Sequence, residues 1–370
     1  MTPRRVTLLG SGGRAALSLV GLRDDIELHT FHPRSLEQDV ALNFEPMGVS
    51  VTVYATPCRH TFEYLHPLAR PRIVPFPGRN VVSVAVEARE VLRFGCLEGD
   101  FCVTAKRAVY DPQSGAGPAA FGDNGSRAER LAVVLNAEEI RSLTGEDDIT
   151  AAAASIMSRD SAAAIVVKDG PFGAYVFEVQ ASPRHIPAYQ TRSVYKIGSG
   201  DVFSASFAHA WLPGGASAAD AADLASRRTA DYVESPAFPL PRVVTRRTAA
   251  SVGASRHRVL IASTQTTTSS RWLLEEAVRG LEDLGATIVR EENLLRGRGP
   301  HVKKGDFDVV LILLHDKDNA VADTRAALAY GKSVVAFADD PAILDTVHRL
   351  GAIVEEDLCS ALYRTQWIST

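Results

Sequence analysis

Short apolar runs that are rich in β-branched residues recur along the whole chain, and they constrain its fold more than any other feature. Residues 81–86, 131–135 and 164–167 are continuous apolar runs rather than alternating ones. Such runs are typical of strands that are buried on both faces of a parallel sheet. Helical patterns, Gly and Pro separate the runs. The sequence therefore predicts an α/β fold built on a parallel sheet.

The chain divides into two blocks. The first covers residues 1–244, and the second covers residues 257–370. Residues 245–256 are small, polar and aperiodic, which predicts a solvated linker; contact of their arginines with phosphate is the alternative. In the second block the pattern predicts strands at 259–262, 308–314 and 333–338 and helices at 272–284, 324–330 and 341–350. This alternation predicts a smaller parallel α/β domain of the flavodoxin or Rossmann type.

Charge and cysteine content narrow the class of protein. The formal net charge is −4, so the chain lacks the basic surplus that nucleic acid or an anionic membrane would attract. The four cysteines form no CxxC pair, which favours a reducing compartment. The N-terminal apolar stretch is too short for a secretory signal, and no run is long enough to span a bilayer. We expect a cytoplasmic protein with a small-molecule ligand and neither nucleic acid nor membrane as partner.

The most informative segment is a Gly-x-Gly-Asp turn, Gly198-Ser199-Gly200-Asp201, which opens directly into the apolar helix predicted at 202–212. Glycines let a chain turn tightly beside a ligand, and a helix N-terminus offers unpaired N–H groups and partial positive charge. Together they suit an anion such as a transferring phosphoryl group. Asp201 there is either a helix-capping carboxylate or a base that takes a proton from an attacking hydroxyl.

The turn and the Asp201-Val202-Phe203 sequence after it resemble the C-terminal signature of the ribokinase (PfkB-type) family of sugar and nucleoside kinases. The resemblance implies a ribokinase-like three-layer sandwich for residues 1–244. It also implies ATP and Mg²⁺ as cofactors, and a sugar or nucleoside hydroxyl as phosphoryl acceptor. By the same resemblance Asp201 is the catalytic base, and the ATP-binding residues of the turn are Gly198, Ser199 and Gly200.

Three further segments follow in the order of that family. Asn136 and Glu139 resemble its Asn-x-x-Glu motif, which implies that Asn136 lies near the phosphates and that Glu139 holds Mg²⁺ through water. Asp111 stands where the family often has Asp-Pro-Asn, and we expect it to bind substrate. Residues 166–174 resemble the strand and turn that approach ATP, with the expected contacts at Lys168, Gly170 and Gly173.

The N-terminal segment departs from the family pattern. Residues 6–9 read as a strand that merges with the Gly12-Gly13 turn, which leaves little room for the family's β lid. We expect a reduced lid, with Gly12 and Gly13 close to the substrate. Arg14 is either a binder of an anionic substrate group or an exposed surface residue. Ribokinase relatives often dimerise through the lid, so a homodimer is one expectation. His60, Tyr64 and His66 are further candidates for the substrate wall, with ordinary strand and loop residues as the alternative.

The second block resembles, more weakly, the nucleoside 2-deoxyribosyltransferase family and its N-glycosidase relatives. The resemblance rests on residues 259–263, 306–313 and 323–332. The resemblance makes Asp323, predicted at a helix start, the nucleophile on an anomeric carbon. This sequence has Asp where the family has Glu, and residues 318–321 lack the family's loop glycine. A binding or structural domain is therefore the alternative.

Two hypotheses for the whole chain remain open at this stage. One is a two-domain enzyme that phosphorylates a sugar or nucleoside and binds or cleaves an N-glycoside. The other is a catalytically impaired regulator that binds a nucleotide or sugar without turnover. Detection of phosphorylated product would separate them.

Overall fold

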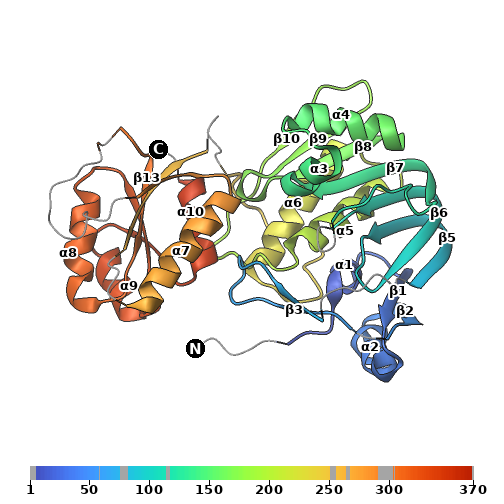
Figure 1. Cartoon of the computed structure of the whole chain (residues 1–370), viewed down its shortest axis with the longest axis horizontal. Coiled ribbons are helices and arrows are strands. Elements are labelled where there is room, and N and C mark those ends of the chain that lie inside the picture. The colour runs from blue at the N-terminus through green and yellow to red at the C-terminus, as the bar shows by residue number, and fades with distance from the viewer. Residues whose placement is uncertain are drawn as a thin grey trace.

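The computed structural model describes residues 6–57, 59–75, 82–113, 117–250, 256–263, 267–290, 303 and 305–368. Two sheets dominate it, and Figure 1 shows them side by side with helices on their faces. Among the described residues no helix is long and apolar enough to cross a bilayer.

The larger sheet has six strands in the order β10-β9-β8-β7-β6-β5. Strands β5 to β8 run parallel, and the β8–β9 and β9–β10 pairs are antiparallel. The predicted parallel sheet is therefore confirmed for its central strands but not for one edge. The bounds are β5 (Val82–Phe94), β6 (Gly99–Asp111), β7 (Arg127–Asn136), β8 (Ala164–Lys168), β9 (Ala174–Glu178) and β10 (Arg184–Ile186).

Helices cover both faces of this sheet, which gives the predicted three layers. On one face Val134 and Val166 pack against Phe207 and Trp211 of α5 (Ser199–Trp211) and the alanines of α6 (Ala218–Glu234). On the other face Val133 and Ile165 pack against α3 (Ala137–Thr144) and α4 (Ile149–Asp160). Neighbouring residues of a strand point to opposite faces, so the continuous apolar runs serve both layers.

The N-terminal part differs from the expectation. Residues 6–9 form no strand, and Gly10 to Arg14 lie in the first turns of helix α1 (Gly10–Leu19). A Cβ at Gly13 would lie only 2.6 Å from Cζ of Phe44 in α2 (Glu37–Phe44). The glycines here let two helices approach closely, whereas sequence reasoning took them for a strand-to-turn junction.

Among the described residues, two small sheets and three short 3₁₀ turns complete the first part of the chain. Strands β1 (Ile26–His32) and β2 (Val49–Ala55) pair in parallel, and β3 (Thr61–Glu63) and β4 (Arg72–Val74) pair antiparallel. The 3₁₀ turns are η1 (Arg34–Leu36), η2 (Glu45–Met47) and η3 (Gly170–Phe172).

The second sheet is wholly parallel, in the order β12-β11-β13-β14-β15, which is the flavodoxin-type doubly wound order. Helices α7 and α10 pack on the face toward the larger sheet, and α8 and α9 pack on the outer face. We call residues 256–368 the C-terminal unit. Its elements are β11 (Arg258–Ser263), α7 (Thr268–Asp283), β12 (Thr287–Arg290), β13 (Val309–Leu313), α8 (Lys317–Leu328), β14 (Ser333–Phe337), α9 (Pro341–His348), β15 (Ile353–Glu355) and α10 (Leu358–Trp367).

The segment predicted as a solvated linker is exposed at most of its described residues, and it is also anchored at two points. Arg247 forms ion pairs with Asp231 at 3.1 Å and Glu234 at 2.8 Å, and Ala250 is buried. One hydrophobic cluster then runs from Val202 and Tyr232 into α7 and α10. Composition indicated a connector because its residues are small and polar, and Arg247 within it also binds the end of α6. Residues 251–255 lie outside the described part of the chain.

Candidate functional site

The Gly-x-Gly-Asp turn forms the N-terminus of α5. Gly198 has φ +83°, and a Cβ there would collide with the side chain of Arg14 and lie 2.9 Å from the Tyr232 hydroxyl. The Ser199 N–H donates to the Lys196 carbonyl, and the Val202 N–H donates to the Gly198 carbonyl. No described residue accepts from the N–H groups of Gly200 and Asp201, so this helix end can bind an anion.

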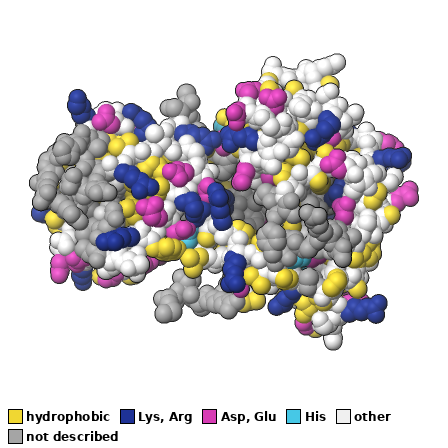
Figure 2. All heavy atoms as spheres, viewed as in Figure 1, with side chains coloured by type: hydrophobic (Ala, Val, Ile, Leu, Met, Phe, Trp, Pro, Cys, Tyr) yellow, Lys and Arg dark blue, Asp and Glu magenta, His cyan; other side chains and the backbone are white. Residues whose placement is uncertain are grey.

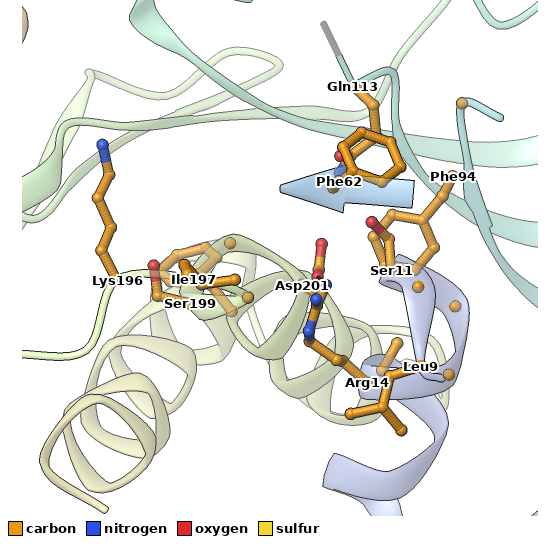
Figure 3. A pocket seen from close by; sticks show the side chains of 18 of the residues that line it. Leu9, Ser11, Arg14, Phe62, Phe94, Gln113, Lys196, Ile197, Ser199 and Asp201 are labelled. Atoms are coloured by element: carbon orange, nitrogen blue, oxygen red, sulfur yellow. Dashed lines mark hydrogen bonds and ion pairs between the residues drawn. The ribbon is translucent and has the colours of Figure 1, made fainter. Parts of the chain in front are cut away.

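Asp201 is the third residue of α5 and is 5 % exposed. Its Oδ2 accepts a hydrogen bond from Nη1 of Arg14 at 2.9 Å (Figure 3). Burial raises the pKa of Asp201, the Arg14 guanidinium opposes that rise, and Asp111 adds to it. Asp201 is therefore a carboxylate whose affinity for a proton is increased, as a general base for a hydroxyl requires.

Lys168 lies beside the same turn, at the end of β8. Its Nζ is 3.5 Å from the place that a Cβ on Gly200 would take, and it donates to Oδ2 of Asp111 at 2.8 Å. Burial lowers the pKa of Lys168, but Asp111 and Glu139 raise it more, so the pKa is raised overall. A fixed positive charge thus stands next to the open helix end, where it would neutralise a phosphoryl group.

Asp111 anchors this arrangement from beneath. It is fully buried and also accepts from Ser204 Oγ at 2.6 Å and from Gln113 Nε2 at 3.0 Å. We expected Asp111 to bind substrate, but its side chain is occupied by these contacts and does not line the cleft described below. Its contacts hold Lys168 instead. Sequence reasoning missed Ser204, although it lies one turn after Asp201 on the same helix.

Asn136 and Glu139 form a capping box at the start of α3. Asn136 Oδ1 accepts from the Glu139 N–H at 2.8 Å, and Glu139 Oε2 accepts from the Asn136 N–H at 2.8 Å. Burial raises the pKa of Glu139 to about 7, while Lys168 acts in the opposite direction. Oε1 of Glu139 has no partner among the described residues, which suits a hydrogen bond to a metal-bound water.

A cleft of about 2940 Å³ joins these groups. Asp323 does not line it, because it lies buried within α8. That helix begins at Lys317 and is capped by Asp316, so the predicted helix start at Asp323 and the loop at 318–321 are wrong. The remaining predicted site residues line the cleft, as do His60, Tyr64 and His66: Gly12, Gly13, Arg14, Asn136, Glu139, Lys168, Gly170, Gly173, Gly198, Ser199, Gly200 and Asp201.

Direct metal ligation is not apparent in the described part of the chain. No group of three or more His, Cys, Asp or Glu side chains there is arranged to hold a metal ion. Glu139 presents one carboxylate to the cleft, and a single carboxylate fits Mg²⁺ that keeps most of its waters.

A model of a known protein family matches the segment that contains most of the site residues. Residues 131–234 match the model of the pfkB family of carbohydrate kinases. This segment runs from β7 to α6 and includes Asn136, Glu139, Lys168 and Asp201. The match confirms the ribokinase-like resemblance for this part and supports a carbohydrate kinase. The resemblance of the C-terminal unit to deoxyribosyltransferases stays a prediction.

Other comparisons give fold likeness alone or no match. No curated protein sequence matches the chain. A pyrophosphate-dependent kinase of the ribokinase family, solved with a pyrophosphate analog and myo-inositol, is 16% identical, with 63% of this chain and 89% of that chain covered and a TM-score of 0.43. A ribokinase from Thermotoga maritima is 18% identical (62% and 84% covered, TM-score 0.44). A fructokinase from Vibrio cholerae O395 is 13% identical (60% and 84% covered, TM-score 0.43).

Proposed function

We propose that the protein transfers the terminal phosphoryl group of ATP to a hydroxyl of a sugar or nucleoside. The observation that carries this proposal is the meeting of buried Asp201, the open N-terminus of α5 and Lys168 in one cleft. The pfkB family match to residues 131–234 supports it.

The reaction follows from the roles of these groups. Asp201 accepts the proton of the acceptor hydroxyl as the new O–P bond forms and the bond to the β-phosphate breaks, which releases ADP. The N–H groups of Gly200 and Asp201 and the Lys168 ammonium stabilise the charge on the transferring group. Glu139 and Asn136 would hold Mg²⁺ through its waters, and that ion would neutralise charge on the phosphates.

Arg14 acquires a role that differs from the expected one. It lies in α1 and donates to Asp201, and its side chain is 18% exposed. We assign it to holding the Asp201 carboxylate in place rather than to an anionic acceptor. An uncharged sugar or nucleoside is therefore the acceptor class that we favour.

The test is a panel of pentoses, hexoses and nucleosides with Mg²⁺ and ATP, followed by phosphorus NMR of the products. We expect a new phosphate ester with at least one acceptor, and its loss in Asp201→Asn. Binding of ATP and acceptor without any ester would instead support the regulator hypothesis and overturn the proposal.

We propose no glycosidase activity for the C-terminal unit. The predicted nucleophile Asp323 is buried in the body of α8 and has no share in the cleft. A nucleophile must come close enough to the anomeric carbon for a bond to form. Ligand binding by this unit stays a prediction.

A further inference from the structure

Two segments of the first part of the chain adjoin the groups assigned above to the phosphate donor. One is the turn from Asp169 to Gly173, which follows Lys168. The other is the segment from Thr191 to Lys196, which leads into Gly198. Both are held by the C-terminal unit.

Arg256 binds the first of these segments. Its Nη2 donates to both carboxylate oxygens of Asp169, at 2.8 and 3.0 Å, and its guanidinium lies 4.3 Å from the centre of the Phe172 ring. Another of its nitrogens donates to the Leu284 carbonyl at the end of α7. Arg256 therefore ties the turn to the C-terminal unit by charge, by hydrogen bonds from one nitrogen to both carboxylate oxygens and by ring contact.

Helix α10 binds the same turn a second time. The indole Nε1 of Trp367 donates to the Pro171 carbonyl at 2.9 Å, and both groups are buried. The Tyr363 hydroxyl lies 3.6 Å from the place that a Cβ on Gly170 would take. Gly170 and Gly173 both have positive φ, at +53° and +93°. A turn with such backbone angles depends on its surroundings to stay in one conformation.

The second segment is also held by α10, through residues of both its first and its last turn. The Val194 N–H donates to Oγ of Ser360 at 2.8 Å in a buried contact, and Arg364 Nη2 donates to the Thr191 carbonyl at 3.1 Å. Val194 stands four residues before Gly198. One helix thus holds the backbone on both sides of the helix end where the phosphoryl group is proposed to bind.

The junction is also supported away from the site. His66 pairs with Glu276 at 2.8 Å, and Arg70 pairs with Asp283 at 3.1 Å; both acidic partners lie on α7. On the face drawn in Figure 2, Lys and Arg side chains gather where the two units meet.

We propose that the C-terminal unit serves the kinase as a scaffold for its phosphate-donor site, with Arg256 and Trp367 as its main positioning residues. The proposal rests on the proposed function, because that function makes Lys168 and Gly198 donor-binding groups. It gives the C-terminal unit a role that needs no chemistry of its own. A misplacement of catalytic groups by about 1 Å can lower rate by about a hundredfold, so the support has a measurable effect.

Three variants test the proposal in the full-length protein. Arg256→Ala removes the tie to Asp169, and Trp367→Phe removes the donated hydrogen bond but keeps a ring in the buried site. Arg258→Ala is the matched control, because Arg258 is similarly exposed and pairs at 2.9 Å with Asp308 inside the C-terminal unit. We expect KM for MgATP to rise about tenfold or more in the first two variants. KM for the acceptor should stay within about twofold of wild type in all three, because these residues contact Asp169, Pro171 and Asp308 and not Asp201, which faces the acceptor hydroxyl.

Calorimetric titration of MgATP, with thermal unfolding to show that each variant is folded, separates this proposal from the one on which it rests. If folded Arg256→Ala and Trp367→Phe bind MgATP as tightly as Arg258→Ala does, the scaffold role is overturned, and product formation by wild type still upholds the kinase. If wild type makes no phosphate ester with any acceptor, the kinase proposal fails. The MgATP affinities of the same variants then decide the scaffold role separately, and weaker binding in the two junction variants supports it.

Discussion

At the scale of single residues, the pairing of Arg14 with Asp201 is the contact with the most direct consequence for activity. Both side chains are largely buried, and they meet across 187 positions of sequence. Burial favours the protonated form of Asp201, and the Arg14 charge favours the ionised form. The ionised form is the one that accepts a proton from the acceptor hydroxyl.

Replacement of Arg14 should therefore change the pH dependence of kcat. In Arg14→Leu the pKa of Asp201 rises further, because burial remains and the compensating charge is gone. A smaller fraction of Asp201 is then ionised at any given pH, so the acid limb of the kcat profile moves to higher pH. The other charged groups facing Asp201, Asp111 and Lys168, are unchanged.

The control for that profile is Arg14→Lys, which keeps the charge and should leave the acid limb closer to that of wild type. Steady-state assays between pH 5 and 9 measure both variants. An acid limb in Arg14→Leu that coincides with the wild-type limb would contradict the claim that the Arg14 charge affects the pKa of Asp201, whatever the variant does to stability.

Residue identity in the site was largely predictable, and residue pairing was not. The turn at Gly198–Asp201 and the residues Asn136, Glu139 and Lys168 follow from local motifs. Arg14 was singled out, yet its partner was not, because no local pattern records a contact between α1 and α5. Asp111 was expected beside the substrate. Its burial under Lys168 could not be predicted, because that burial depends on how three strands and a helix pack.

At the scale of elements, α5 depends on the conformation of Gly198, the residue that precedes it and caps its N-terminus. Gly198 sits at φ +83° with Arg14 and the Tyr232 hydroxyl against it. Gly198→Ala would place a methyl group into that contact and hold a non-glycine residue in the left-handed region. We expect a loss of about 1–3 kcal/mol of unfolding free energy from the backbone alone, and a large loss of kcat as the helix end moves.

Urea denaturation and kinase assays of Gly198→Ala measure the two effects. Gly145→Ala is the matched control, because Gly145 has φ +73° at the end of α3 but open space around the position of its Cβ. Gly145→Ala should lose a similar amount of unfolding free energy through backbone strain but should keep the wild-type kcat. Equal kcat in both variants would contradict the role given to the Gly198 turn.

Several elements could not be read correctly from the sequence. The first turns of α1 hold three glycines, and local propensity assigns such a segment to a turn rather than to a helix. In the structure the segment is helical, and the missing side chain of Gly13 leaves room for Phe44. Helix α8 begins seven residues before the predicted start, because Asp316 and not Asp323 caps it. Strands and helices with long regular patterns, such as β7, β8, α5 and α7, were predicted well since their own sequence favours them.

At the scale of the whole molecule, the two sheets share one hydrophobic cluster. Val202, Tyr232 and Val233 of the first part pack with Leu281, Leu362 and other residues of α7 and α10. The anchored segment around Arg247 removes the freedom that a flexible linker would give. The division into two blocks stays a prediction from sequence patterns, and those patterns hold no information on this shared burial.

The shared cluster predicts that the chain unfolds as one cooperative unit. Separation of the two parts would expose apolar surface on both, at a free-energy cost of about 25 cal/mol per Å². Neither part should therefore stay folded on heating after the other has unfolded. Differential scanning calorimetry should show a single transition whose calorimetric and van't Hoff enthalpies agree. Two well-separated transitions would show that the junction contributes little.

The central claim is that Asp201 takes the proton of the acceptor hydroxyl, and single-turnover phosphoryl transfer by Asp201→Asn tests it most directly. With MgATP and the best acceptor saturating, the account predicts a fall in the transfer rate of about 10²- to 10⁴-fold, with MgATP affinity within a few-fold of wild type. A transfer rate in Asp201→Asn that equals the wild-type rate would contradict it.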